Sequence, residues 1–336
     1  NKDTVYLNLE MEFRELAPFT VRPDAPDTVF GSERISVADY AFLNDGRMLL
    51  LTYEVNIHKE TRVLLCDADQ EILSGAILPD EPIQLRQHFR GQVSVECKNG
   101  LAYLVMIDHD DISLIEWDMD FYENQLKPIV DSVAGFYLHS NYSDVIPAFE
   151  YFAYSQRDSI NFRVHSIIDK QTMELYRAEY KYLHPQDKLW AYRQELRTGV
   201  DKEIWAGARF FTSSLYYKPV YAPLFVQGEH ILIFDHYRDQ VVSYDTSFQV
   251  VDSSGIAYHK VHGNGWDWQE SLIQDGSTKE IYTTYLKDGY MHLLHINPLT
   301  GETSETLKLH FRYPEHVTVR DGVVYYIYRP FESIQK

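Results

Sequence analysis

One pattern repeats along the chain: an apolar strand, a short polar turn, a second apolar strand, and then Asp or Asn. The strand-ending residues are Asp67, Asp118, Asp169, Asp245 and Asn297. Their spacings are 51, 51, 76 and 52 residues, so the long interval equals one repeat plus about 25 inserted residues. A period near 51 residues predicts a chain built from one repeated supersecondary unit.

The residues inside each repeat favour antiparallel strands. Apolar positions alternate with a period of two, and Val, Ile, Tyr and Phe fill them. Tight-turn signals separate paired strands at Asp45-Gly46, Asn99-Gly100, Asp275-Gly276 and Asp321-Gly322, with Gly228 in the fourth copy. Four strands in about 50 residues is the size of one β-propeller blade. We therefore predict an all-β chain, a six-bladed β-propeller of four-stranded antiparallel blades forming a single domain over residues 1–336.

Other fold classes fit this pattern less well. The best helical candidate, residues 186–196, falls inside the inserted stretch. A β-sandwich needs far fewer strands, and a parallel-sheet enzyme needs long helical crossovers. The excess residues predict an aromatic-rich insertion at about 181–211, between the third and fourth blades.

The turn signals also predict the strand order within each blade, lettered a to d from the axis outward. Asx-Gly turns join a to b, and the Asp or Asn positions open the c–d turns. The sixth blade then holds strand a at residues 316–320, strand b at 323–328 and the start of strand c at 332–336. Its outer strand is expected from the amino terminus, where residues 4–13 alternate well, and this pairing would close the ring.

The composition excludes several function classes. The 336 residues include 31 Lys and Arg against 50 Asp and Glu, a formal charge of −19. This acidic balance argues against nucleic acid and anionic membranes as main partners. No apolar run approaches the roughly 18 residues of a membrane span. An aromatic content of 14% excludes a disordered chain.

Cysteine usage sets a weaker limit. Two cysteines, Cys66 and Cys97, exclude a disulfide-dense secreted scaffold. Both lie in alternating apolar runs, which favours buried free thiols over a bridge between neighbouring strands. The chain opens at Asn1 rather than Met, as expected if a targeting segment has been removed or the chain trimmed.

The repeated strand–Asp pattern and the closing run at residues 326–332 resemble the six-bladed β-propeller proteins, in particular a largely uncharacterised group from bacterial cell envelopes. The resemblance covers essentially the whole chain. It implies the same fold and an exported, periplasmic or cell-surface location, and it implies no catalytic residues. The Ser-x-Asp-x-Gly box of sialidases and the double Gly of kelch repeats are missing from the sequence, and a Trp-Asp ending does not recur from repeat to repeat.

Cations recur at one position of the predicted repeat. The slot ten residues before each turn glycine marks the expected entrance to strand a. This slot holds Arg90, Lys218, Trp266 and Arg312, while Arg34 lies two residues before the corresponding Ser36. Convergent Arg and Lys at a channel mouth favour an anionic group such as a carboxylate or sulfate. The alternative is that these side chains pair with acids on the rim.

Aromatic residues accompany the cations. Trp266 and Trp268 project to the same side of an extended segment, which suits stacking on sugar rings or a peptide, or packing between blades. The insertion contributes Arg209 among many aromatic residues, and Tyr217 lies where the chain returns toward the axis. A long insertion in a compact fold is typically a lid, a binding loop or an interface.

Histidines recur in one slot of the predicted b–c turns, at His58, His109 and His236. Equivalent slots of different blades lie around a ring, too far apart to place ligands about 2 Å from one metal. The acidic turn at residues 108–111 lacks the Gly and Glu spacing of a calcium loop, so a solvated turn is expected, with a weak cation site as the alternative. We therefore predict no metal and no cofactor.

The leading hypothesis is a non-enzymatic propeller that binds a small molecule, glycan or peptide at its channel mouth. One alternative is a glycan hydrolase or lyase using the same cavity. Its candidate carboxylates are Glu150, Asp267 and Glu270, and no nucleophile motif accompanies them. A second alternative is a protein–protein interaction scaffold that uses the insertion, which predicts an apolar patch outside the channel.

Overall fold

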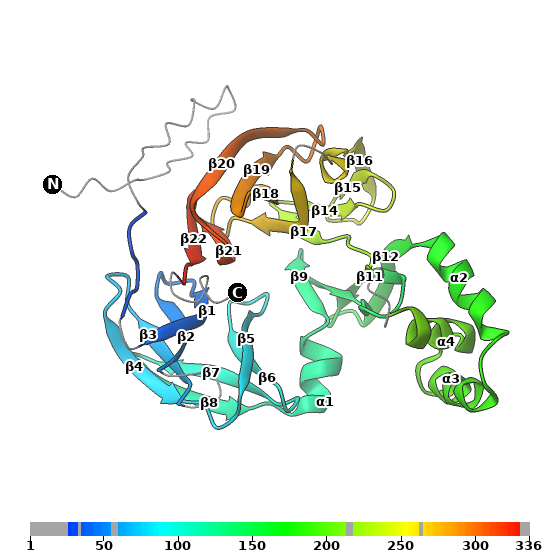
Figure 1. Ribbon diagram of the computed structural model, residues 1–336, viewed down its shortest axis with the longest axis horizontal. Helices are drawn as coiled ribbons and strands as arrows, with labels where there is room; N and C mark the ends of the chain where they lie inside the picture. The colour runs from blue at the N-terminus through cyan, green and yellow to red at the C-terminus, as the bar shows by residue number, and fades with distance from the viewer. Residues whose placement is uncertain (1–25, 33–34, 55–59, 213–217, 262–264, 330–336) are drawn as a thin grey trace. The chain divides into compact units, whose positions relative to one another are not determined.

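The computed structural model describes residues 26–32, 35–54, 60–212, 218–261 and 265–329 (Figure 1). The chain divides into two compact units. One unit combines Asn1–Lys127 with Ala257–Lys336, and the other is Pro128–Ile256. Each unit is built from antiparallel sheets whose consecutive strands are neighbours, the meander expected from the repeat.

The first unit contains three four-stranded sheets and one two-stranded sheet within the described residues. The first two sheets are β1 (Ser36–Phe42), β2 (Met48–Tyr53), β3 (Arg62–Cys66) and β4 (Ile72–Ile77), then β5 (Pro82–Gln87), β6 (Val93–Cys97), β7 (Ala102–Asp108) and β8 (Asp111–Glu116). The others are β17 (Asp267–Gln274), β18 (Ile281–Lys287), β19 (Tyr290–Ile296) and β20 (Thr303–Arg312), then β21 (Glu315–Arg320) and β22 (Val323–Ile327). Three short helical segments are α1 (Met119–Phe121), η1 (Tyr122–Leu126) and η2 (Tyr258–Lys260).

The second unit contains two four-stranded sheets with a helical insertion between them. The sheets are β9 (Ile129–Val133), β10 (Phe136–Ser140), β11 (Ala148–Ser155) and β12 (Ile160–Ile168), then β13 (Leu224–Gln227), β14 (His230–Asp235), β15 (Gln240–Tyr244) and β16 (Val250–Gly255). The helices, which together form the helical module, are α2 (Lys170–Tyr180), α3 (Pro185–Thr198) and α4 (Lys202–Phe211).

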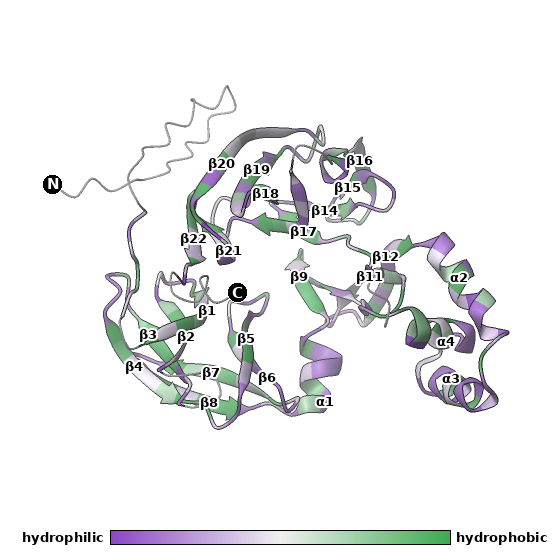
Figure 2. Cartoon of the chain, viewed as in Figure 1, coloured by the Kyte–Doolittle hydropathy of each residue, from purple (hydrophilic) through white to green (hydrophobic). Residues whose placement is uncertain are grey.

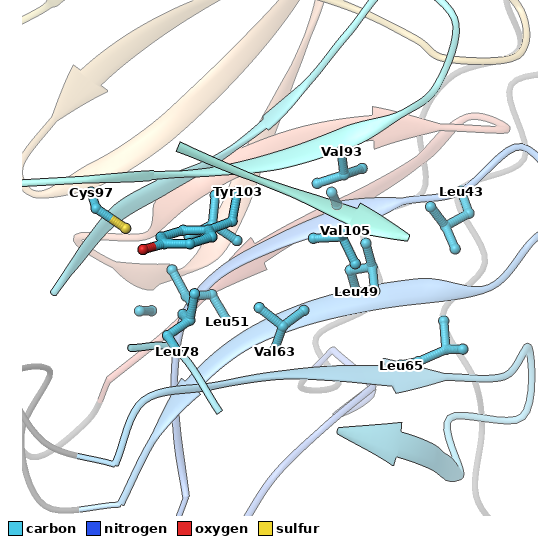
Figure 3. Packing of buried hydrophobic residues seen from close by; sticks show 13 residues of the cluster. Leu43, Leu49, Leu51, Val63, Leu65, Leu78, Val93, Cys97, Tyr103 and Val105 are labelled. Carbon is cyan, nitrogen blue, oxygen red and sulfur yellow. The ribbon is translucent and has the colours of Figure 1, made fainter. Parts of the chain in front are cut away.

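Neighbouring sheets of each unit pack face to face through the apolar residues that alternate along their strands. In Figure 3, Leu49, Leu51 and Val63 of the first sheet face Tyr103 and Val105 of the second. The hydropathy colouring follows this packing, with strands such as β7 and β9 mainly green and α3 mainly purple (Figure 2). In the second unit, the sheets of β9–β12 and β13–β16 share one buried cluster in the same way. Serial four-stranded meanders packed by their faces are the building plan of a β-propeller, and the all-β class is confirmed.

Three of the repeated Asp and Asn residues open the third turn of their sheets, as predicted. Asp67 Oδ1 accepts hydrogen bonds from the backbone N–H groups of Asp69 and Glu71 at 3.0 and 2.9 Å. Asp245 and Asn297 use the same side-chain-to-backbone turn in their own sheets. This turn fixes the chain reversal between the third and fourth strands, which explains the recurrence.

The other two repeated aspartates have a different role, so the predicted assignment of turns to strands is wrong in two sheets. Asp118 and Asp169 follow the fourth strand of their sheets and cap helices α1 and α2 through the backbone N–H groups of Phe121 and Thr172. Helix N-caps and Asx turns select the same residue because both need a short side-chain acceptor for backbone N–H groups. The Asn99-Gly100 turn consequently joins the second and third strands of its sheet rather than the first and second.

The first turns of these two sheets carry no Asx-Gly pair. Gly91 lies between β5 and β6 with φ of 82°, and Gly135 lies between β9 and β10 with the same φ. Arg90 and Ala134 precede these glycines. The glycines supply the positive φ that the turns require, without the preceding Asp or Asn that makes such a turn visible in a sequence.

The insertion is helical and begins earlier than predicted. A strand was expected directly after Asp169, but α2 occupies that position, and the helical module runs from Lys170 to Phe211. The helical candidate at residues 186–196 lies within α3 and is confirmed. The expected closing strand at residues 4–13 and the strand start at 332–336 lie outside the described residues.

Candidate functional site

Six side chains gather at one end of the β17–β20 sheet, where β17 begins, β18 ends, β19 begins and β20 ends. They are Trp266, Lys287, Tyr290, His292, Lys308 and Arg312, and we call them the rim cluster. The antiparallel register brings them together. Tyr290 is paired with both Lys287 and Arg312, and His292 is paired with Lys308.

The hairpin turn between β18 and β19 positions this cluster. Asp288 and Gly289 form a two-residue turn with φ of 51° and 80°, values that suit an Asp-Gly pair in a type I′ turn. The backbone N–H of Tyr313 donates to the Gly289 carbonyl at 2.8 Å. A Cβ at Gly289 would lie 2.9 Å from the Tyr313 ring, so the turn packs closely against the segment that follows β20.

The cations of the rim cluster rest on aromatic faces. Lys308 Nζ lies 3.7 Å from the Tyr290 ring centroid, and the Arg312 guanidinium lies 5.0 Å from the same centroid. Lys287 Nζ lies 4.8 Å from the Trp266 ring. Lys308 and Arg312 are exposed to solvent. Within the described part of the chain, no carboxylate lies within 4 Å of the three cationic groups.

His292 lies between these cations. Its ring centroid is 4.7 Å from that of Trp266, and its Nδ1 atom is buried without a hydrogen-bond partner among the described residues. Burial lowers the pKa of His292, and the nearby charges of Lys308 and Lys287 lower it further. The imidazole is therefore neutral near pH 7. An anion bound beside it would oppose these effects and favour the charged form.

Two residues predicted for the channel mouth, Trp266 and Arg312, belong to the rim cluster. Trp268 instead packs inside its unit, where its Nε1–H donates to Thr283 Oγ1 at 2.8 Å and its ring contacts His259. The indole N–H and most of the ring are thereby used in packing. The sheet places the two tryptophans in different surroundings although they are two residues apart.

The remaining predicted residues lie elsewhere. Arg90 lies in the β5–β6 turn over the Phe89 ring, not at the entrance to a first strand, because the strand phase differs there. Lys218 is exposed in the segment before β13. Arg209 pairs with Asp187 at 3.0 Å within the helical module. Arg34 and Tyr217 lie outside the described residues.

Sequence reasoning missed four members of the rim cluster. Lys287 and Tyr290 flank Asp288-Gly289, a strong hairpin signal that was not used to place residues. The alternation of Lys308, His310 and Arg312 along one strand was the second available signal. His292 gave no signal of its own, because only the register of β19 with β20 brings it beside Lys308.

The repeated histidines are not brought together. His109 is exposed and its Nδ1 lies 2.9 Å from Asp108 Oδ1, while His236 Nδ1 donates to the Tyr221 carbonyl at 3.0 Å. His58 lies outside the described residues. In the portion of the chain that is described, no group of three or more His, Cys, Asp or Glu side chains is placed to hold a metal ion.

A Tyr, His, Asp and Arg cluster in the second unit is the arrangement most like a catalytic centre. His165 Nδ1 lies 2.7 Å from the Tyr244 hydroxyl, and Asp235 lies 3.5 Å from His165 Nε2 and 3.2 Å from the Arg238 guanidinium. Burial would raise the pKa of Asp235, but the close approach of His165 and the hydrogen bonds from Arg238 outweigh it and lower the pKa. Asp235 is fully buried, and Tyr244 is 5% exposed. The cluster thus links β12 to β14 and β15, and its Asp and Tyr side chains are buried by this packing.

The candidate carboxylates for glycan cleavage have local structural partners. Glu150 Oε1 accepts from Arg163 at 3.0 Å, and Asp267 Oδ2 accepts from Gln269 Nε2 at 3.0 Å. Glu270 is on the same strand as Asp267, at a φ of 50° within the irregular part of β17. None of these contacts favours general acid–base chemistry over ordinary surface pairing.

A groove of about 560 Å³ in the first unit runs beside β22. It is lined by residues 26–32, by β1 and by β22, with aromatic side chains that include Phe30, Tyr40 and Phe311. In the described chain, β22 pairs with β21 on one side and has no strand on the other. The groove follows this unpaired edge.

Cys66 and Cys97 are buried free thiols, as expected. Burial raises the pKa of each thiol to about 11. Of the helices in the described ranges, none is long and apolar enough to cross a membrane.

Comparison with known proteins gives a likeness of fold without a family. No protein-family model matches the chain, and no curated protein matches it. Similar solved structures include BamB from Moraxella catarrhalis, with 9% identity, a TM-score of 0.31, and coverage of 82% of this chain and 65% of that chain.

Two others are the Cps50 (Swd1) β-propeller domain from Myceliophteria thermophila and the calcium-binding protein regucalcin from Agrobacterium tumefaciens. The first has 9% identity, a TM-score of 0.35, and coverage of 84% and 76% of the two chains. The second has 8% identity, a TM-score of 0.35, and coverage of 86% and 80%. The β-propeller architecture assigned here rests on the sheet topology rather than on these distant likenesses.

Proposed function

We propose that this protein binds an acidic glycan, or another small molecule bearing a carboxylate or sulfate, at the rim cluster, and that it does so without catalysing a reaction. The main support is the placement of Lys308 and Arg312 on the Tyr290 ring without an acidic partner among the described residues. On a chain with a formal charge of −19, such a group of cations is a local exception that attracts anions.

In this proposal the cations of the rim cluster bind the anionic group, and its aromatic rings stack on the sugar. The planar Arg312 guanidinium suits two parallel hydrogen bonds to a carboxylate or sulfate, and Lys287 and Lys308 add point charges. The half-buried Trp266 and Tyr290 rings offer apolar faces for a sugar ring. An anion held here also stabilises a protonated His292.

A thermal-shift experiment tests this function with defined probes. We expect trigalacturonic acid and a heparin tetrasaccharide to raise the melting temperature at low salt, and neutral maltotriose to leave it unchanged. The Arg312→Ala variant should lose most of the shift. The matched control is Arg163→Ala, which removes an exposed arginine from another sheet and should keep it. The function is wrong if acidic and neutral probes act alike, or if both variants respond like the parent protein.

We also propose that the sheets form a closed six-bladed wheel in one domain, with residues 4–13 supplying the outer strand of the blade that contains β21 and β22. The support is that this blade has only two strands among the described residues, whereas the other sheets have four, and that a groove runs along β22. A full-length variant with residues 4–13 scrambled keeps composition but loses alternation, so we expect it to melt at a lower temperature than the parent. An unchanged melting temperature contradicts this closure.

An exported location, periplasmic or cell-surface, is proposed on the resemblance to the cell-envelope propellers. Fractionation of cells that make the native protein, followed by immunoblotting, tests it. Recovery in the periplasmic or surface fraction is expected, and recovery in the cytosol alone contradicts it.

A further inference from the structure

The outward side of α3 carries an apolar stripe with positive charges beside it. Leu189, Tyr192 and Leu196 are 52%, 46% and 70% exposed, and their spacing of three and four residues places them along one line of the helix. Arg193 and Arg197 lie exposed on the same side. We call these five residues the α3 face.

The opposite side of α3 packs on α4. Ala191 is buried, and Trp190 meets Trp205 of α4 edge to face with centroids 6.3 Å apart. Both acids of α3 also point toward α4. Asp187 pairs with Arg209 at 3.0 Å, and Glu195 pairs with Lys202 at 3.7 Å.

The acidic residues of α3 therefore face α4, and two of its arginines face outward. Its two carboxylates are neutralised by α4, whereas neither Arg193 nor Arg197 has a carboxylate within 4 Å in the described part of the chain. The outward face thus presents aliphatic and aromatic surface with positive charge, on a protein whose overall charge is −19. Exposed charges of this kind select a partner of the opposite sign.

We propose that the α3 face docks an acidic amphipathic helix of a partner protein. A helix lying along α3 would place apolar residues at spacings of three and four against Leu189, Tyr192 and Leu196, with Glu or Asp beside the two arginines. Symmetric pairing of α3 with a second copy would bring arginines near arginines. An anionic membrane is disfavoured as the main occupant because the chain is strongly acidic.

Fluorescence anisotropy with designed peptides tests this docking. The probe is an 18-residue helical peptide with a Leu stripe flanked by Glu, and its counterpart carries Lys in place of Glu. The full chain should bind the Glu peptide at least tenfold more tightly than the Lys peptide. Arg193→Glu/Arg197→Glu should weaken the Glu peptide by tenfold or more. The control Lys170→Glu/Arg177→Glu makes the same charge change on exposed residues of α2 and should keep most of the binding.

Three results overturn the proposal. The first is equal binding of the two peptides, and the second is binding that Arg193→Glu/Arg197→Glu leaves intact. The third is another occupant. Sedimentation showing self-association that Leu189→Ser/Leu196→Ser abolishes would identify a second copy, and binding to phosphatidylserine vesicles in preference to the Glu peptide would identify a membrane. The melting temperature of each variant is measured first, so that loss of binding is not confused with unfolding.

Discussion

The rim cluster and the α3 face both present cations that have no acidic partner among the described residues of an acidic chain, but they are built differently. In the rim cluster, four strands fix the side chains, and the cations rest on the faces of Tyr290 and Trp266. On the α3 face, the arginines flank an exposed aliphatic stripe of a single helix. Positive charge is therefore held on aromatic rings in the rim cluster and beside an aliphatic stripe on the α3 face.

This difference indicates what each surface suits. Cations held on aromatic rings at the end of a sheet concentrate charge within the dimensions of a sugar or a small acid. A helix face offers a long, shallow surface, which suits an elongated partner with matching periodicity.

Loss of Asp275 should disturb the unit that carries the rim cluster. Its fully buried carboxylate accepts from the backbone N–H groups of Ser277, Thr278, Asp321 and Gly322 at 2.8–3.1 Å, joining the β17–β18 turn to the β21–β22 turn. Burial would raise the pKa of Asp275, but these four donors outweigh it and lower the pKa. We expect Asp275→Ala to cost about 4 kcal/mol, because it leaves several buried donors unpaired.

Hydrogen exchange checks the location of this effect. Protection in β17–β22 should fall, while α2–α4 should keep theirs. The depressed pKa also predicts that the contribution of Asp275 is present above the unfolded pKa near 4 and is lost as pH falls through the folded pKa. Uniform loss of protection over both units would contradict the prediction that Asp275 stabilises only the unit that carries the rim cluster.

Gly207→Ala should disturb the helical module and leave the rim cluster intact. A Cβ at Gly207 of α4 would lie 2.3 Å from Cβ and Cγ of Tyr176 on α2, and 2.5 Å from its Cα. The two helices must separate to admit it, at a cost of about 3 kcal/mol. We expect weaker binding of the Glu peptide to the α3 face with an unchanged response to trigalacturonic acid. A loss of both responses would show that the two surfaces are not independent.

Replacing the Tyr290 ring tests whether the cations need their aromatic support. Tyr290→Ala should weaken trigalacturonic acid by roughly fivefold to tenfold, since cation–π contacts at exposed sites contribute about 0.5–1 kcal/mol each. Tyr290→Phe keeps the ring and should bind nearly as well as the parent. Calorimetric titration compares the three proteins. Equal affinity for the alanine and phenylalanine variants would mean that the ring has no role in binding.

The smallest predicted effect is a pH dependence due to His292. Its pKa is lowered in the free protein, so it destabilises the fold as pH falls below the unfolded value near 6.5. A bound sulfate group would raise that pKa. The affinity for a heparin tetrasaccharide should therefore increase severalfold between pH 7.5 and 5.5, and His292→Gln should remove most of the increase. A flat profile in the parent protein would exclude His292 from the site.

The sequence predicted the class of fold because alternation and turn chemistry are local properties. The sequence assigned the wrong strand order to two sheets. Asp118 and Asp169 recur at the spacing of Asp67, but they cap helices after the fourth strand, whereas Asp67 opens the turn between the third and fourth strands. The sequence singled out Trp266 and Arg312, which the structure brings together in the rim cluster, yet it could not find His292. That residue joins the site through a cross-strand register that no local pattern encodes.

The rim cluster is proposed to bind an anion through cations that have no acidic partner among the described residues. The most direct test is calorimetric titration of the parent protein and of Lys308→Ala/Arg312→Ala with trigalacturonic acid at 20 and 200 mM salt. We expect binding that weakens with salt and falls at least tenfold in the variant, while the melting temperature of the variant stays within a few degrees of the parent. Equal affinity of a folded variant, or binding insensitive to salt, would contradict it.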